Sequence, residues 1–76
     1  MRIMVVPLVD VSDMLCAQAL AKVAQALARL APGETLDVRH NTSDVKQDLV
    51  VWAASAGHPA AESGAGLLRI TRRVAR

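Results

Sequence analysis

The order of hydrophobic and polar residues predicts a strand at the start of the chain and another near its middle. Residues 3–9 form a nearly continuous apolar run, which is typical of a strand covered on at least one side. Pro7 cannot donate to a strand ladder, so we expect this strand to lie at a sheet edge or to leave that position unpaired. In residues 35–40 the side chains alternate between a mainly apolar and a polar face, which indicates a half-buried strand.

The segment between these two strands has the period of a helix with one apolar face. Ser12 or Asp13 is the expected N-cap, and Pro32 followed by Gly33 ends the helix. Charged side chains lie away from the apolar stripe, which consists of Cys16, Leu20, Val23, Leu27 and Leu30.

A second helix is predicted to follow the middle strand. Gln47 stands three residues after Asp44, as in a capping box, and Gly57 followed by Pro59 stops the helix. The possible N-caps are Thr42, Ser43 and Asp44, and the apolar stripe consists of Val45, Leu49, Trp52, Ala53 and Ala56.

The C-terminal part is expected to form a hairpin, in which a short strand at residues 59–63 pairs with the segment 66–74 through a turn at residues 63–66. The element order is then β-α-β-α-β-β, and the first strand–helix–strand crossover makes its two strands parallel with a right-handed connection. Each helix has a single apolar stripe, so both helices lie on one face of the sheet. The sequence predicts an α+β fold, a two-layer α/β sandwich with two helices on one face of a four-stranded mixed sheet, as a single domain over residues 1–76.

Composition narrows the classes of function. The chain has one cysteine, which excludes an internal disulfide, and with two histidines it cannot supply an ordinary structural zinc site. We therefore expect neither a metal nor a cofactor. No apolar run reaches the length of a membrane span and no signal-peptide cleavage site precedes the fold, so we expect a cytoplasmic protein without membrane contact.

The charge pattern gives little support to nucleic-acid binding. The net charge is +2, and arginines gather near the C-terminus. Trp52 is the only aromatic residue of the Phe, Trp and Tyr types, so the stacking platform of common RNA-binding modules is missing. This argues against direct nucleic-acid binding, although the basic tail keeps a weak RNA-binding protein as a third hypothesis.

Cys16 is the residue on which the functional interpretation depends. Free cysteines are among the most buried residues, and this one lies on an apolar stripe, so the residue pattern alone favours a core position. The other interpretation is a thiol displayed at the start of a helix. There the free amide groups would lower the pKa of the thiol, and the Asp13 carboxylate would oppose them.

Two stretches carry a resemblance to a known family. "DVSDMLCAQALAKVAQALARLAPGE" places a cysteine at a helix start and a Pro-Gly turn after the helix, and "DLVVWAASAGH" follows in the second helix. The chain resembles the TusA family of small sulfur carriers, also described as SirA-like, in length, element order and spacing. The residues that match are Asp10, Cys16, Pro32, Gly33, Asp48, Trp52, Gly57 and His58.

The chain departs from the family pattern around the thiol. The family's Cys-Pro-x-Pro is replaced by the segment 16–19, Cys-Ala-Gln-Ala, and Val50 stands where the second helix of the family often has proline. A residue before proline is pushed out of the helical region, and Ala17 removes that constraint. We therefore expect that the first helix could begin at Asp13 and draw Cys16 inward as its third helical residue.

The resemblance implies a sulfur carrier whose catalytic residue is Cys16. The thiol would accept sulfane sulfur as a persulfide from a protein donor, a cysteine desulfurase or a rhodanese-like protein, and pass it to an acceptor protein. The implied pathways are thiolation of transfer RNA, cofactor sulfuration and sulfur metabolism. The missing prolines motivate a second hypothesis, a non-catalytic binding or regulatory module on the same scaffold. The sequence thus leaves open whether this sulfurtransferase-like carrier is an enzyme.

Other residues are candidates for supporting or docking roles. An apolar face of the first strand, made of Met4, Val6 and Leu8, could favour a weak homodimer. The charged or polar candidates are Asp13, Lys22, Asp48 and His58.

Overall fold

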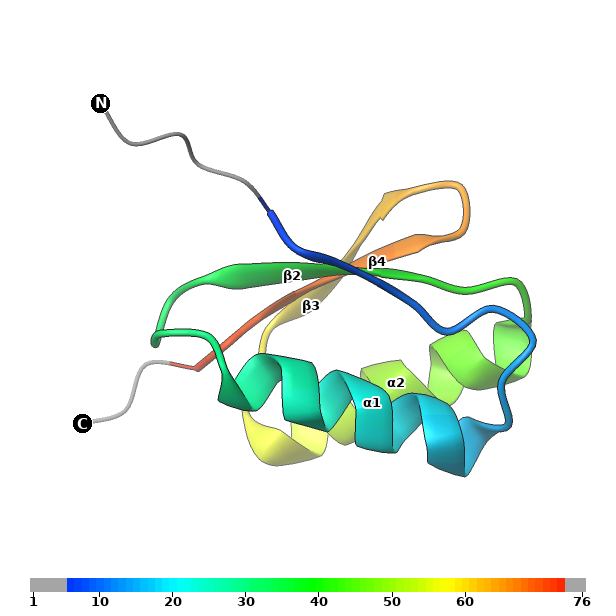
Figure 1. Cartoon of the computed structure of the whole chain (residues 1–76), viewed down its shortest axis with the longest axis horizontal. Coiled ribbons are helices and arrows are strands. Elements are labelled where there is room, and N and C mark those ends of the chain that lie inside the picture. Colours follow the sequence, from blue (N-terminus) through cyan, green and yellow to red (C-terminus); the bar gives the residue numbers. More distant parts are fainter. Residues whose placement is uncertain (1–5, 74–76) are drawn as a thin grey trace.

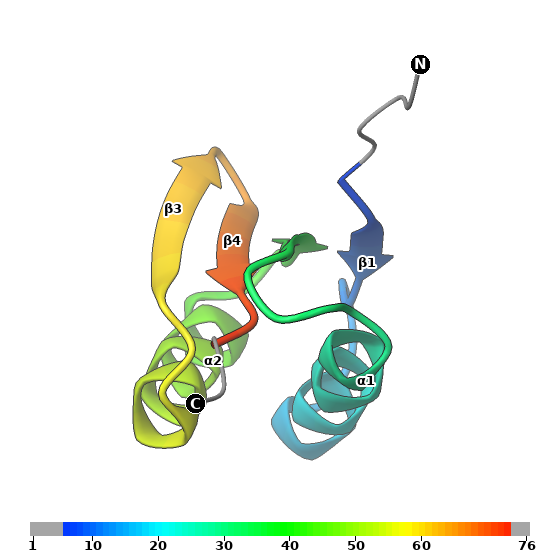
Figure 2. The same cartoon turned by 90° about the vertical axis from the view of Figure 1, so that its left-hand side faces the viewer.

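The computed structural model describes residues 6–73 and contains four strands and two helices (Figure 1). Their order is β1 (Leu8–Asp10), α1 (Cys16–Ala28), β2 (Thr35–Arg39), α2 (Ser43–Ala56), β3 (Ala60–Gly64) and β4 (Leu67–Thr71). The strands form one sheet in the order β1-β2-β4-β3, with β1 parallel to β2 and the other pairs antiparallel. Both helices lie on the same side of this sheet, side by side (Figure 2). The predicted two-layer α+β sandwich is therefore confirmed.

The core lies between the sheet and the two helices. Alternate side chains of β2 and β4 face the helices, and the remaining ones, among them the ion-paired Asp37 and Arg69, face the open side of the sheet. The Arg69 Nε–Asp37 Oδ1 distance is 2.9 Å. The buried hydrophobic residues are Val11, Ala19, Val23, Leu27, Leu36, Val38, Val45, Leu49, Ala53, Leu68 and Ile70.

The first strand is shorter than the predicted segment 3–9, of which residues 3–5 lie outside the described part. It begins at Leu8, because the preceding Pro7 has no N–H to donate. The Pro7 carbonyl still accepts from the Asp37 N–H at 2.9 Å. As predicted, β1 is an edge strand. Of its proposed apolar face, Met4 is not described, and Val6 and Leu8 are 39% and 54% exposed.

The start of α1 corrects the sequence prediction. Neither Ser12 nor Asp13 is the N-cap: Leu15 takes that position, and Cys16 is the first helical residue rather than the third. Asp13 has a left-handed backbone, with φ of 63°, so it cannot belong to the helix. Its N–H donates to Asn41 Oδ1 at 3.0 Å, and the Asn41 amide donates back to its carboxylate at 2.7 Å. These reciprocal bonds hold the loop in a turn and keep the helix from starting early.

The N-cap of α2 is Thr42, the first of the three predicted caps, and the helix begins at Ser43. The Thr42 hydroxyl accepts from the Val45 N–H at 3.3 Å, so Asp44 lies two residues after the N-cap and the predicted capping box of Asp44 and Gln47 does not form. Gly57 ends the helix as predicted, because its φ of 81° is a left-handed conformation that glycine adopts without strain.

The C-terminal hairpin is confirmed, with slightly shifted bounds. β3 pairs antiparallel with β4, and the register shifts between Glu62 and Gly64. β4 ends at Thr71, and the Arg72 N–H then donates to the Glu34 carbonyl at 2.8 Å. The end of the predicted segment 66–74, residue 74, lies outside the described residues.

The inner face of α2 is expected to carry much of the stability of the fold. Leu49 is 0% exposed, and Leu49→Ala should lower the free energy of unfolding by about 2–5 kcal/mol through lost burial and a cavity. Val51, two residues further along α2, is 63% exposed, and Val51→Ala should change this free energy by no more than about 0.5 kcal/mol. Urea denaturation of both variants measures the difference. Equal effects would contradict the placement of Leu49 in the core.

Candidate functional site

The thiol of Cys16 lies at the first residue of α1 and is partly exposed. The first intrahelical bond runs from the Ala19 N–H to the Leu15 carbonyl at 2.9 Å. The amides of residues 16–18 therefore have no acceptor within the helix, and they give this end a partial positive charge. Cys16, the only cysteine of the chain, is thus partly exposed and lies at the helix terminus.

The start of α2 brings acidic side chains to the same place. The two helices run side by side in the same direction, so their N-terminal ends are neighbours (Figure 1). The Asp48 carboxylate, as an acceptor for the S–H group, raises the pKa of Cys16, and desolvation and the negative charges of Asp48 and Asp44 raise it further. The backbone N–H of Cys16 itself acts in the opposite direction and is outweighed. The thiol is therefore held in its protonated form at neutral pH.

The sequence suggested that the Asp13 carboxylate opposes a lowering of the pKa of Cys16. In the structure Asp48 has this effect instead. The Asp13 carboxylate is engaged by Asn41 across the loop, and it is not among the groups that shift the pKa of Cys16. Asp44 was considered in the sequence only as a helix cap. Its contribution could have been found from the spacing, because Asp44 and Asp48 are four residues apart and share one face of α2.

The other two candidate residues lie elsewhere. Lys22 Nζ donates to the Asp10 carbonyl at 3.3 Å, next to the end of β1. His58 follows α2 at the opposite end of the helix pair, where its Nδ1 accepts from the Arg73 N–H at 3.0 Å. Burial, then the charges of Arg73 and Arg72, lower the pKa of His58. Of the four candidates, Asp48 is the one that the structure brings to the thiol.

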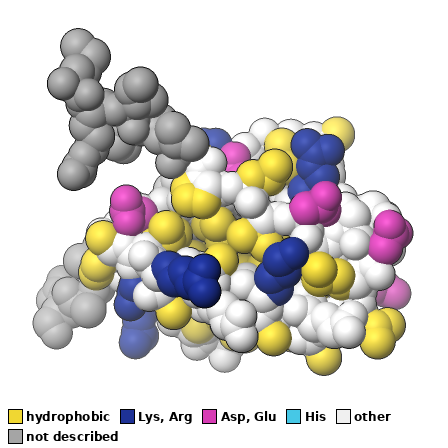
Figure 3. Space-filling view, in the orientation of Figure 1, with side chains coloured by type: hydrophobic (Ala, Val, Ile, Leu, Met, Phe, Trp, Pro, Cys, Tyr) yellow, Lys and Arg dark blue, Asp and Glu magenta, His cyan; other side chains and the backbone are white. Residues whose placement is uncertain are grey.

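Exposed apolar side chains accompany the acidic ones near the thiol. Leu15, directly before Cys16, is 72% exposed, and Val51, one turn after Asp48 on α2, is 63% exposed. Figure 3 shows acidic side chains at the end of the molecule where both helices begin, and basic side chains among apolar ones over α1. The surroundings of the thiol therefore combine negative charge with exposed hydrocarbon.

The described residues show no sign of a metal centre or a membrane anchor. Within residues 6–73 no three His, Cys, Asp or Glu side chains are grouped so that they could hold a metal ion. Neither of the two described helices has both the length and the apolar character needed to cross a bilayer.

The fold and the site define a small α+β protein with one accessible thiol at a helix start. Residues 8–73 match the family described as sulfurtransferase TusA. Because this match spans most of the chain, the protein belongs to the TusA sulfurtransferase family, which confirms the resemblance seen in the sequence and indicates a role in protein-based sulfur transfer. No curated protein and no solved structure matches the chain.

The influence of Asp48 on the thiol can be measured directly. Asp48→Asn removes a negative charge beside Cys16, so the pKa of the thiol should fall and its alkylation by iodoacetamide at pH 7 should become faster. The midpoint of the pH–rate profile should move to lower pH. Glu34→Gln is the matched control, because it removes the same charge in the turn after α1 and should leave the profile unchanged. An unchanged profile for Asp48→Asn would contradict the proposed contact.

Proposed function

We propose that this protein carries sulfane sulfur as a persulfide on Cys16 and delivers it to an acceptor protein. The proposal rests on one observation above all, the partly exposed thiol at the first residue of α1 in a chain of the TusA family. Access to solvent is the property that a carrier needs most, because the attacking and leaving groups both belong to protein thiols.

The transfer step follows thiol–disulfide exchange. The Cys16 thiol loses its proton, and the thiolate attacks the outer sulfur of a cysteine persulfide on the donor. A new S–S bond forms on Cys16, the S–S bond of the donor breaks, and the donor cysteine leaves as a thiolate. The persulfide on Cys16 is stabilised as an anion by the unbonded amides of the first helical turn. Delivery to the acceptor repeats the exchange with Cys16 as the leaving group.

Asp48 and Asp44 give this carrier a control on when its thiol reacts. In the free protein they raise the pKa of Cys16 and keep it protonated. A donor surface with Lys or Arg side chains would neutralise these carboxylates on docking, which lowers the pKa of the thiol within the complex. The exposed Leu15 and Val51 supply apolar contacts for the same docking surface. The thiol is then activated by the partner rather than by a resident base.

Loading of the thiol is the direct test. Incubation with a cysteine desulfurase and cysteine should increase the mass of the intact protein by one sulfur atom, and reduction should reverse the change. Cys16→Ser should show no increase, because the chain has no other cysteine. Failure to load under conditions that load a relative with Cys-Pro-x-Pro would overturn the proposal and favour the hypothesis of a binding module.

Charge complementarity with the donor predicts a salt effect. The rate of loading should fall as ionic strength rises, because attraction between exposed charges is screened over about 8–10 Å at 0.1–0.15 M salt. Asp44→Asn should show a weaker salt dependence of loading, whereas Glu34→Gln should behave like the parent protein. A loading rate that increases with salt would contradict docking through a basic donor surface.

A further inference from the structure

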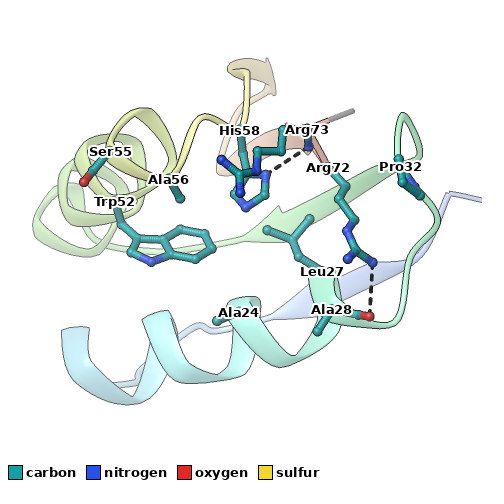
Figure 4. Close-up of a pocket in the computed structure, with 10 residues that line it drawn as sticks. All are labelled: Ala24, Leu27, Ala28, Pro32, Trp52, Ser55, Ala56, His58, Arg72 and Arg73. Carbon is teal, nitrogen blue, oxygen red and sulfur yellow. Dashed lines mark hydrogen bonds between the residues drawn. The ribbon is translucent and has the colours of Figure 1, made fainter. Parts of the chain in front are cut away.

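A pocket lies between the two helices at the end remote from Cys16 (Figure 4). Its volume is about 460 Å³, within the range of pockets that hold small molecules. Trp52 of α2 and Leu27 of α1 form apolar walls, and His58, Arg72 and Arg73 close the side toward the sheet. The space exists because the helix positions around it carry small side chains, Ala24, Ala28 and Ala56.

The polar side chains that line this pocket offer hydrogen-bond donors. The His58 Nδ1 accepts from the Arg73 N–H at 3.0 Å, so the proton of the neutral ring is on Nε2. Burial and the two neighbouring arginines lower the pKa of His58 and keep the ring neutral at pH 7. The Arg73 side chain folds back toward this ring (Figure 4). Ser55 adds a hydroxyl group to the lining.

The charged side chains that line the pocket, Arg72 and Arg73, are both positive. Among the described residues that line it, none is Asp or Glu. Arg72 Nη1 donates to the Ala28 carbonyl at 3.2 Å and to the Leu30 carbonyl, so its charge offsets the negative end of α1. Arg73 adds a second positive charge next to His58. An anionic group is therefore the one that these donors would accept.

We propose that this pocket binds a small organic anion that has a planar ring and a phosphate or carboxylate group. The ring would pack against Trp52, whose ring centroid lies 5.6 Å from that of His58, and the anionic group would accept hydrogen bonds from Arg73 and His58. Ala24, the lining residue of α1 that is closest in sequence to Cys16, is eight residues away, about 12 Å along the helix. The ligand would thus not react with the thiol, and the site is independent of sulfur transfer.

Fluorescence of Trp52, the only tryptophan of the chain, reports on this site. Phenyl phosphate and benzoate, used as probes with the full chain, should change the emission in a saturable way. Inorganic phosphate should bind more weakly, because it lacks the ring, and benzylamine should not bind. The stronger of the two ring-bearing anions identifies the preferred anionic group. Equal binding of benzylamine, or no saturable change with either anion, would overturn the proposal.

Two variants test the hydrogen-bond donors of the pocket and its volume separately. Arg73→Gln should weaken binding of the stronger probe about tenfold or more, because it removes a charge-assisted bond. Arg39→Gln, which removes the same charge on the open face of the sheet, should bind it as the parent protein does. Ala28→Leu should abolish binding by filling the pocket while leaving both arginines in place, and Cys16→Ser should leave binding unchanged. Binding that survives both Arg73→Gln and Ala28→Leu would place the probe elsewhere and refute the site.

Discussion

The pair of hydrogen bonds between Asp13 and Asn41 determines where the thiol lies. Asp13 belongs to the loop before α1 and Asn41 to the loop before α2, so the bonds join the two helix starts. The left-handed backbone of Asp13 keeps this residue out of the helix, and the extended backbone of Leu15, with ψ of 153°, makes Cys16 the first helical residue. One turn more of helix would have moved the thiol away from the terminus. The position of Cys16 beside Asp48 thus depends on a contact between two loops as well as on the packing of the two helices.

The sequence predicted the architecture well because that architecture follows from local patterns. The alternation in residues 35–40 and the apolar stripes of the helices identify the layers, and Gly57 marks a helix end through its own backbone preference. The start of α1 was wrong for a physical reason: Asp13 is a good cap by residue type, but its side chain is held by a residue 28 positions away. A contact of that range leaves no signal in a local pattern.

The functional site was only partly predictable, because it depends on which residues the fold brings together. Family spacing pointed to Cys16 as the catalytic residue, but nothing in the sequence separated Asp48 from the other supporting candidates, Asp13, Lys22 and His58. The parallel alignment of two helices decides which residues meet, because it places both N-termini at one end and both C-termini at the other. Asp44, in the first turn of α2, stabilises the start of this helix and at the same time disfavours the thiolate of Cys16. Stability of the helix and reactivity of the thiol are therefore opposed at one carboxylate.

The edge strands of the sheet, β1 and β3, limit how the sheet can pair with a strand of another molecule. β1 has three residues and follows a proline, and β3 has an irregular register near Gly64. Short, interrupted edges offer few consecutive free amides and carbonyls to a strand of another molecule. Within the described residues, the edges of the sheet are therefore poor templates for a strand of another copy.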